Sequence, residues 1–418
     1  MPKRIEKRGE NSYRLCVTAG YTGDGKQKFY RKTITATTER EAKKQYALFV
    51  AEVEKGQTAS CGKMTLNQFF SYWKEHYAEN HLAKKTILDY TGLFQRISFA
   101  LGHKRLDHIQ PKDLLAFFKN ISEVGIRQDP NKSRRKKSHP EEAELISSKP
   151  LSPSTQRKYY ALLHSLFEKA TLWNMIPYNP ASKIEPPKLD YIPKEIYDKE
   201  TTGKFLLELE GESLKHRVMA LLALSIGARK GELFGLSWNH INLETGTVKI
   251  ERQLQYFKED GLVLNPLKTR SSKRTNTIPK SLLPLLKTYK VEQTSQRLKL
   301  GEKWEGAPSL DEDFIFTAWN GQPNHPDTFN SWLKRFTSTH ALPSLTPHSF
   351  RHMAATYLLT AGTDIKTVSG KLGHSSTAIT GTIYSHMLET SEQASADKME
   401  DFLQQTTSQA KRQKKQAN

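Results

Sequence analysis

Hydrophobic and polar positions alternate near the start of the chain and then change to a helical spacing. SYRLCVTAGY and KQKFYRKTITA alternate on either side of TGDGK, and Asp-Gly between alternating runs is typical of a β-hairpin. In the next segment, TEREAKKQYALFVAEVEKG, Thr38 and Glu41 form a capping-box pattern at the start of a helix. Residues 1–57 are therefore predicted to form a small three-stranded sheet with one helix behind it.

The second part of the chain has helical periodicity. After the polar linker GQTASCGK, apolar residues fall at helical spacing in MTLNQFFSYWKEHYAENH, KKTILDYTGLFQRISFALG, PKDLLAFFKNI and SPSTQRKYYALLHSLFEKATLWNMI. Pro111 and Pro153 lie near two predicted helix starts, where proline is tolerated. Residues 64–186 are therefore predicted to form an all-helical domain. Residues 126–150 interrupt it with a basic block beside an acidic one, which predicts an extended or disordered insertion.

The last part of the chain combines helices with a few strands. VMALLALSIG and HSFRHMAATYLLTAG predict helices, whereas VKI and TNTIP show strand alternation. Residues 190–395 are predicted to form a mainly helical domain with a small β-sheet, so the whole chain is predicted to be α+β and multidomain. In residues 396–418 we expect a short helix and then a disordered basic tail. One side of that helix is apolar and needs a partner surface; it is lined by Met399, Phe402 and Leu403.

The composition favours a polyanionic partner. The 418 residues have a formal net charge of +20 and a pI near 9.6, and the charge is spread along the chain. The longest apolar run, around residues 217–228, is too short to span a bilayer, and MPKRIEKRGENSYR continues without the apolar segment of a signal peptide. Cys16 and Cys61 are too few for a disulfide framework or a cysteine-built metal site. We therefore expect a location in the reducing cytoplasm and no membrane partner.

The last third also contains an ordered set of groups suited to attack on a DNA phosphodiester. Arg229 lies in the turn after VMALLALSIG. His348 precedes Arg351 by one helical turn in TPHSFRHMAATYLLTAG. The glycine of KLGHSS can end a helix and leave His374 at the helix-to-loop junction. Tyr384 follows a short distance downstream, in TAITGTIYSHM.

These residue types fit phosphoryl transfer. Two guanidinium groups can bind two non-bridging phosphate oxygens, because each is a planar fork of donors that stays charged. The reaction needs little beyond positioning and charge stabilisation. A tyrosine oxygen can attack phosphorus and form a covalent protein–DNA intermediate that conserves the bond energy. Because tyrosine titrates at about 10, it needs a base or cationic neighbours, and His348 and His374 are the candidates.

GARKGEL, HSFRHMAATYLLTAG and LGHSSTAITGTIYSH resemble the catalytic segments of the tyrosine recombinase (phage integrase) family. The resemblance implies that Arg229 and Arg351 clamp the scissile phosphate. It also implies that His348 and His374 bind the phosphate or transfer protons, and that Tyr384 forms a 3′-phosphotyrosyl bond.

The family also uses a lysine on a β-hairpin as general acid toward the departing 5′-oxygen. Lys268 in PLKT matches that lysine best, and Lys273 is the rival. The chain departs from the family at Phe350-Arg351-His352-Met353, where Leu-Arg-His-Thr is usual, and at Gly227-Ala228-Arg229, where Gly-Leu-Arg is usual. Both departures keep the charged group. The resemblance to the catalytic region covers roughly residues 190–390.

Each group also has a purely structural explanation. An Arg-Lys-Gly-Glu turn is commonly a solvated helix start, His374 could cap a helix end by charge, and Tyr384 could be a packing residue. His348 and His352 lie four apart and could be a metal pair, but no further ligand follows at the expected spacing, so no metal is predicted. The combination of suitable residue types in the right order favours the chemical interpretation.

Basic residues elsewhere are candidate DNA contacts, with ordinary solvated charge as the alternative. The N-terminal sheet resembles the arm-binding domain of lambda-type integrases, whose sheet enters the major groove of sites away from the crossover. The helical domain resembles the family's core-binding domain, which would form a C-shaped clamp with the catalytic domain. The candidates in the sheet are Arg14, Lys26, Lys28, Arg31 and Lys32. Those at helix starts, where phosphates bind, are Lys84, Lys85, Arg157 and Lys158.

These observations predict a site-specific recombinase, an integrase of a bacterial phage or mobile element, acting without ATP, cofactor or obligatory metal. The resemblance implies a homotetramer on double-stranded core and arm sites, a Holliday junction, and association with the nucleoid. Candidate helpers are an excisionase and a DNA-bending host protein. The C-terminal helix would dock onto a neighbouring protomer or onto its own domain. The alternatives are a type IB topoisomerase, which needs no specific sites, and a catalytically silent DNA-binding regulator.

Overall fold

The computed structural model divides into two compact units, Met1–Ile192 and Pro193–Asn418, each described here by itself. The described residues are 5–21, 27–54, 64–123, 150–189, 196–267, 269–310, 312–374, 376–378, 380–381 and 399–408. Within these ranges, no helix has both the length and the apolar character needed to cross a membrane.

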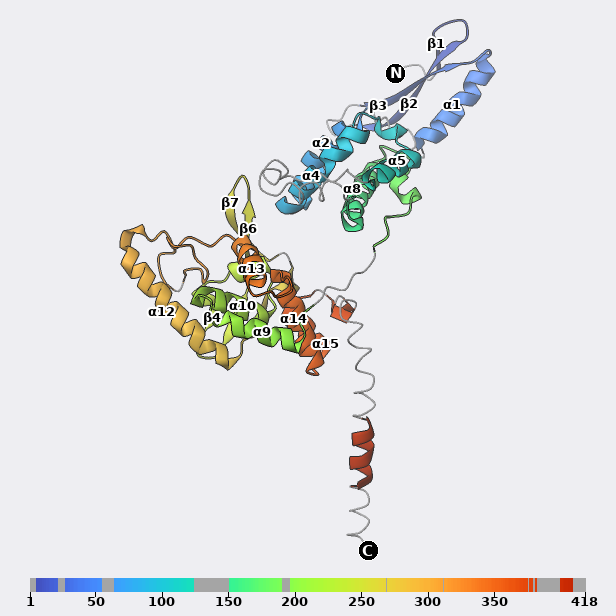
Figure 1. Ribbon diagram of the computed structural model, residues 1–418. Helices are drawn as coiled ribbons and strands as arrows, with labels where there is room; N and C mark the ends of the chain where they lie inside the picture. Colours follow the sequence, from blue (N-terminus) through green and yellow to red (C-terminus); the bar gives the residue numbers. More distant parts are fainter. Residues whose placement is uncertain are drawn as a thin grey trace. The chain divides into compact units, whose positions relative to one another are not determined.

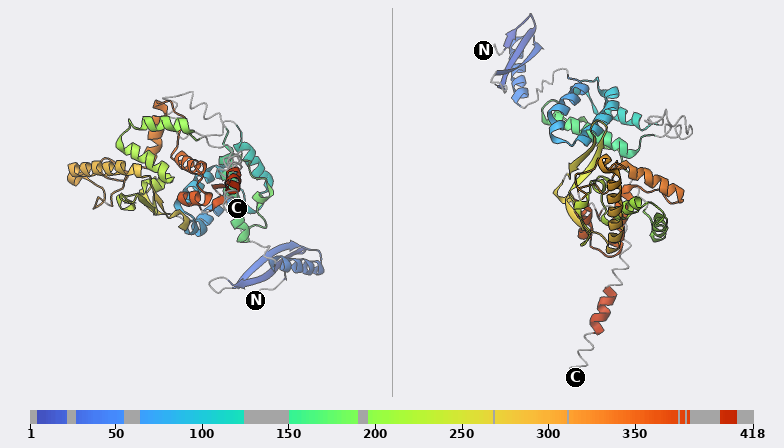
Figure 2. Two further views of the ribbon diagram at one scale, coloured as in Figure 1. Left: turned by 90° about the horizontal axis from the view of Figure 1, so that it is seen from below. Right: turned by 90° about the vertical axis from the view of Figure 1, so that its left-hand side faces the viewer.

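The first unit begins with the predicted sheet and helix (Figures 1 and 2). The antiparallel strands β1 (Ile5–Lys7), β2 (Ser12–Tyr21) and β3 (Gln27–Thr35) lie in sequence order, and α1 (Glu39–Glu54) covers one face. The core between sheet and helix includes Tyr13, Leu15, Val17, Ile34, Ala42 and Phe49.

The capping box predicted for α1 consists of two hydrogen bonds, of which one is confirmed and the other is wrong. The Oγ1 of Thr38 accepts a hydrogen bond from the backbone N–H of Glu41 at 3.3 Å. The Glu41 carboxylate, however, accepts from the backbone N–H of Thr37 at 3.1 Å rather than from Thr38. The carboxylate therefore reaches one residue further back than the pattern predicts.

The rest of the first unit is helical, as predicted. Its helices pack around a core that includes Leu66, Phe69, Trp73, Leu114, Leu166 and Phe167. α2 continues through a π-helical turn, η1, into α3. The elements are α2 (Leu66–Trp73), η1 (Lys74–Ala78), α3 (Glu79–His81), α4 (Lys84–Leu101), η2 (Leu106–His108), α5 (Pro111–Ile121), α8 (Pro153–Leu172) and η3 (Pro180–Lys183). The insertion predicted at 126–150 falls, except for its last residue, outside the described residues.

The second unit is mainly helical, again as predicted. Its core is rich in aromatic side chains, among them Phe205, Phe234, Trp238, Phe316, Phe329 and Phe350. The longer helices are α9 (Lys199–Leu209), α10 (Leu214–Ile226), α12 (Leu283–Leu300), α13 (Asp327–Thr339), α14 (Pro347–Thr360) and α15 (Ile365–Leu372). The shorter ones are α11 (Lys230–Phe234), η4 (Trp238–His240), η5 (Arg270–Ser272), η6 (Lys280–Leu282) and η7 (Gly301–Lys303). Residues 399–408 are helical as well.

The strands of the second unit form two separate sheets. β4 (Ile241–Asn242), β5 (Thr247–Ile250) and β8 (Arg274–Thr277) make one antiparallel sheet in the order β4-β5-β8. The predicted strands in VKI and TNTIP are thus β5 and β8, paired with each other. Between them the chain forms a separate two-stranded ribbon, β6 (Arg252–Phe257) and β7 (Gly261–Pro266). β8 also packs against α15, which brings the end of that helix to the sheet.

Candidate active site

The turn between α10 and α11 presents Arg229. Gly227 ends α10 in the left-handed conformation, with φ 57°, which glycine adopts without steric cost. A Cβ at this position would lie 2.6 Å from Cδ2 of Leu372, so the turn and the end of α15 are in close contact. Arg229 is the N-cap residue of α11, and 42% of its side chain is exposed. The prediction that a buried helix leads into an arginine-bearing turn is confirmed.

Glu232 anchors the side chain of Arg229. Its carboxylate is 1% exposed and accepts from Nη1 of Arg229 at 2.7 Å and from Nη2 of Arg274 at 2.9 Å. The backbone N–H of Arg229 donates to the same carboxylate at 3.0 Å. Burial opposes ionisation, but the two arginines and this N–H outweigh it and lower the pKa of Glu232. Arg229 is therefore anchored at one edge of its guanidinium group while much of the side chain stays exposed.

The first two turns of α14 contain the next two predicted residues. Thr346 caps this helix, and its Oγ1 accepts from the backbone N–H of Ser349 at 3.3 Å. Arg351 is only 3% exposed, and its Nη1 donates to the carbonyl oxygen of Gly227 at 2.9 Å. His348 lies one turn earlier and is exposed, with its ring edge-to-face against His352 at 4.6 Å between centroids. Arg351 thus joins α14 to the turn that presents Arg229.

His374 lies at the end of α15, as predicted. Gly373 ends the helix with φ 68°, and its carbonyl oxygen accepts from Nη2 of Arg229 at 3.5 Å. Nδ1 of His374 is hydrogen-bonded to Oγ1 of Thr380 at 2.8 Å. Burial, followed by the positive charges of its neighbours, lowers the pKa of His374 to about 4. Those neighbours are Arg351, Arg229, Arg274 and His348. The imidazole is therefore neutral at physiological pH and is surrounded by cationic groups.

The structure therefore brings together Arg229, His348, Arg351 and His374 from three separate segments. Lys268 and Tyr384 lie outside the described residues, so their predicted places in the site stay predictions. Lys273, the rival of Lys268, is exposed in the loop before β8.

Two members of the cluster escaped sequence reasoning. Arg274 and Asn276 lie two residues apart on β8 and therefore on one face of that strand. Asn276 donates to the carbonyl oxygens of Ile226 at 2.9 Å and Lys371 at 3.0 Å. The alternation in this strand places both side chains on the buried face, where polar groups need partners. Two polar residues on the buried face of one strand were therefore the available evidence that Arg274 and Asn276 have a specific role in the structure.

Two protein-family models match parts of this chain. The model for the "Phage integrase family" matches residues 198–391, and the model for "Phage integrase, N-terminal SAM-like domain" matches residues 65–121. The chain belongs to the phage integrase family of tyrosine recombinases. The first match spans the segments that present Arg229, Arg351 and His374.

This recombinase is similar to two bacterial proteins over much of its length. It is 25% identical over 408 residues to a "Tyrosine recombinase XerC-like" protein of Caldanaerobacter subterraneus subsp. tengcongensis, covering 95% of this chain and 97% of the relative. It is 25% identical over 253 residues to the ICEBs1 integrase of Bacillus subtilis, covering 60% of this chain and 67% of the relative. The predicted family and enzyme class, a site-specific tyrosine recombinase of mobile elements, are confirmed.

Solved structures show that the recombinase has the predicted fold class. The Tn1549 transposon integrase in complex with transposon right end DNA aligns with a TM-score of 0.62 at 21% identity, covering 80% of this chain and 99% of that chain. A lambda integrase dimer bound to a COC′ core site aligns with a TM-score of 0.51 at 16% identity, covering 92% and 95%.

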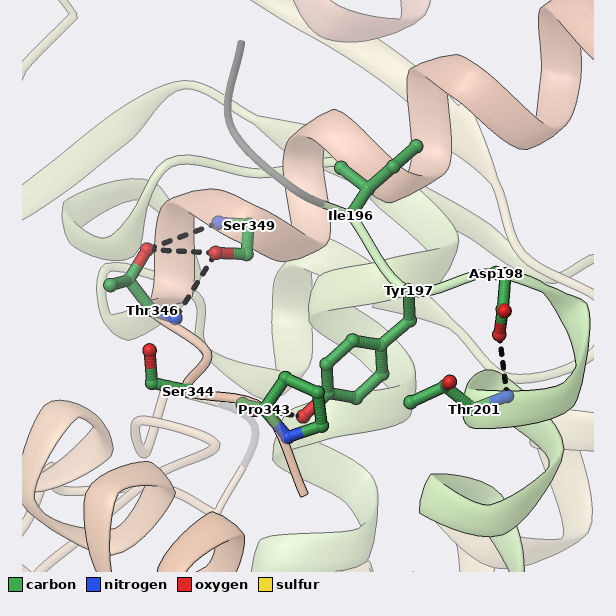
Figure 3. A pocket seen from close by; sticks show the side chains of 8 residues that line it. All are labelled: Ile196, Tyr197, Asp198, Thr201, Pro343, Ser344, Thr346 and Ser349. Atoms are coloured by element: carbon green, nitrogen blue, oxygen red, sulfur yellow. Dashed lines mark hydrogen bonds between the residues drawn. The ribbon is translucent and has the colours of Figure 1, made fainter. Parts of the chain in front are cut away.

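A cavity of about 420 Å³ lies beside the first turn of α14 in the recombinase. Figure 3 shows Tyr197 reaching across it toward Pro343, while Thr346 and Ser349 are bonded to each other on its other side. Burial raises the pKa of Tyr197 to about 12. Arg229, His348, Arg351 and His374, the predicted catalytic residues that the structure describes, do not line this cavity. Of the predicted catalytic residues that the structure describes, Arg229 and His348 are accessible to solvent, whereas Arg351 is buried.

The sheet residues predicted to contact DNA lie on different faces of the N-terminal sheet. The β2–β3 register pairs Arg14 with Thr33 and Cys16 with Arg31, so Arg14 and Arg31 share the face opposite α1. Lys32 lies on the other face, with its Nζ 5.5 Å from the ring centroid of Phe49 in α1. Lys26 and the side chain of Lys28 lie outside the described residues.

Two of the predicted contacts in the helical part, Lys85 and Arg157, have partners within the protein. Lys85 is paired with Asp89 at 3.1 Å on the surface of α4, and Lys84 lies at the start of the same helix. Arg157 donates from Nη1 to the carbonyl oxygen of Pro187 at 2.9 Å, so part of its guanidinium group serves a structural bond. Lys158, on α8, is exposed.

Proposed function

We propose that this recombinase cuts and rejoins double-stranded DNA through a 3′-phosphotyrosyl intermediate formed by Tyr384. The observation that supports this most strongly is the convergence of the guanidinium groups of Arg229 and Arg351 and the imidazole of His348 on His374. A scissile phosphate carries one negative charge, and fixed cations and donors stabilise the charge that develops during its transfer. The cationic and hydrogen-bonding groups of this cluster could supply that charge stabilisation.

In the proposed step, the Oη of Tyr384 attacks phosphorus and the bond between phosphorus and the 5′-oxygen breaks. Arg229 and Arg351 hold the two non-bridging oxygens. The leaving 5′-oxygen takes a proton from Lys268, and the tyrosine proton passes to a nearby base. The reverse attack by a 5′-hydroxyl of a second strand joins the exchanged strands, so no ATP is consumed.

His374 is suited to a neutral role in this step. Because its pKa lies at about 4, the imidazole of the free protein can accept a proton or a hydrogen bond at physiological pH. Thr380 engages Nδ1, and we propose that Nε2 is the atom that faces the phosphate. An approaching anionic phosphate would raise this pKa, because an opposite charge favours the protonated form.

We further propose that four protomers assemble on two DNA sites in the bacterial cytoplasm and pass through a Holliday junction. Among the structural neighbours, one lambda integrase structure is a tetramer bound to a Holliday junction. The N-terminal sheet would bind arm sites through the face with Arg14 and Arg31, and the helical domain would bind core sites. An excisionase and a DNA-bending protein are the proposed helpers.

Strand exchange tests the proposal against its alternatives. Two labelled duplexes that span the junction of the element's ends should give recombinant products with this protein alone or with a DNA-bending protein. A plasmid lacking such sites serves as control. Relaxation of that plasmid without strand exchange would favour a type IB topoisomerase. Binding without any covalent chemistry would favour a regulator.

A further inference from the structure

Arg274 is a buried side chain that touches three segments of the candidate active site. Only 6% of it is exposed. Nη2 donates to Glu232 at 2.9 Å, Nε donates to the carbonyl oxygen of Lys371 at 2.7 Å, and Nη1 donates to the carbonyl oxygen of Ser272 at 3.0 Å. One guanidinium group therefore joins the start of α11, the end of α15 and the loop before β8.

We propose that Arg274 is a positioning residue that orients Arg229 through Glu232 and fixes the place of His374 through Lys371 and Gly373. The proposal rests on the proposed function, in which Arg229 and His374 act on the scissile phosphate. Arg274 itself is buried, and we assign it no contact with DNA.

The link to Arg229 passes through a single carboxylate. Glu232 accepts from both arginines, with one oxygen bonded to each guanidinium group. If Arg274 were lost, the buried carboxylate could rotate, and the edge of Arg229 that it holds would lose its fixed direction. Arginine suits this task because its planar fork donates in several fixed directions at once, whereas a lysine ammonium group behaves as a point charge.

The link to His374 is one of close packing. A Cβ at Gly373 would lie 3.0 Å from Nη1 and 3.2 Å from Cδ of Arg274, so the backbone beside His374 rests on the guanidinium group. Asn276 adds a second bond from β8 to the carbonyl oxygen of Lys371 at 3.0 Å. The end of α15 is therefore held by two side chains from one strand.

The third contact of Arg274, with Ser272, connects it to the loop that contains the predicted general acid. Ser272, whose carbonyl oxygen accepts from Arg274, belongs to the segment between β7 and β8, and Lys268 lies in the same segment. Arg274 thus links the loop that contains the predicted acid to both phosphate-binding segments.

The test compares Arg274→Lys with Arg297→Lys in the full-length protein. Arg297 is a matched control, because it also binds a buried carboxylate, Asp313, at 2.6 Å and a carbonyl oxygen, that of Pro308, at 2.7 Å. It touches none of the catalytic segments described above. The measured quantities are the affinity for a suicide duplex and the single-turnover rate of covalent adduct formation at saturating protein, at a temperature where circular dichroism shows both variants folded.

We expect Arg274→Lys to bind DNA as the wild type does but to form adduct about a hundredfold more slowly, the usual effect of misplacing a reacting group by an ångström or so. Arg297→Lys should keep the wild-type rate. A duplex with a neutral methylphosphonate at the scissile position removes one anionic oxygen, so the defect of Arg274→Lys relative to the control should shrink on it. The ratio of the two substrates' rates is independent of the folded fraction.

Glu232→Gln supplies a further check, because two residues that act through one contact are not additive. Arg274→Lys should slow Glu232→Gln much less than it slows the wild type. Equal rates for Arg274→Lys and Arg297→Lys on the normal duplex would overturn the positioning role, as would full additivity with Glu232→Gln. If wild type itself formed no adduct that depends on Tyr384, the proposed function would fail instead, and the two failures are thus distinguishable.

Discussion

Replacing Glu232 with glutamine removes one charge from the centre of the site and keeps the shape of the side chain. The carboxylate is 1% exposed and binds one guanidinium group that is 6% exposed and one that is 42% exposed. Removing one partner of a buried ion pair costs about 3–5 kcal/mol. Because solvent screens the half-exposed Arg229, we expect the low end of that range, about 3 kcal/mol. For a unit of this size, each kcal/mol lowers Tm by about 2–4 °C.

The same substitution should slow DNA cleavage. Glutamine offers one acceptor and one donor, so it cannot hold both arginines, and Arg229 loses its fixed direction. We expect adduct formation to slow by roughly 10–100-fold with DNA affinity little changed. Asp313→Asn is the matched control, because Asp313 is also buried and also binds an arginine, Arg297. It should lower Tm to a similar extent and leave the cleavage rate of the folded protein unchanged.

The pH dependence of stability gives an independent check on Glu232. Its neighbours hold the pKa below the ordinary value of 4.5, so its contribution to stability is present above that pH and is lost as the pH falls below it. The difference in Tm between wild type and Glu232→Gln should therefore shrink in acid. A Tm unchanged at neutral pH, or a cleavage rate equal to that of Asp313→Asn, would refute the proposed anchoring of Arg229.

Three other outcomes are expected. Lys268→Ala should cleave slowly and recover when sulfur replaces the 5′-bridging oxygen, because sulfur is a better leaving group; recovery with Lys273→Ala instead would reassign the general acid. Gly227→Ala should lower the free energy of unfolding by about 2 kcal/mol or more, since φ is 57° and the new Cβ would meet Leu372 at 2.6 Å; chemical denaturation measures this, and an unchanged value would contradict the described turn. The His374 pKa lies below its ordinary 6.5, at about 4, so the unfolded chain protonates first and stability falls as pH drops between those values; His374→Gln should flatten that part of the unfolding-versus-pH curve, and an identical curve would contradict the pKa assignment.

Local patterns were sufficient to predict much of this site. The apolar run before Gly227 and the glycine before His374 each predict a helix end. Both signals are local, because they depend only on residues adjacent in the sequence. The structure places Arg229 and His374 at those two ends. The ribbon β6–β7 was not separated from β5 and β8 in the sequence, because alternation reports strands but not their partners.

The supporting contacts could not be predicted, because they join residues far apart in the chain. Glu232 marks a helix start in the sequence, and nothing local shows that Arg274 reaches its second oxygen. Lys32 is as basic as the neighbouring candidate DNA contacts. In the structure, however, it lies on the face of the sheet that α1 covers. The side of a strand that a helix covers depends on tertiary packing, which a charge count does not reveal.

The most direct test of the central proposal is to trap the covalent intermediate and locate its bond. Wild type and Tyr384→Phe are incubated with labelled suicide duplexes from the element's junction and separated by denaturing electrophoresis, and the linked peptide is identified by mass spectrometry after proteolysis. We expect a covalent band for wild type, with the nucleotide on the peptide that contains Tyr384, and equal DNA binding but no band for Tyr384→Phe. A band that persists in Tyr384→Phe, or a nucleotide attached to another residue, would contradict the proposed nucleophile.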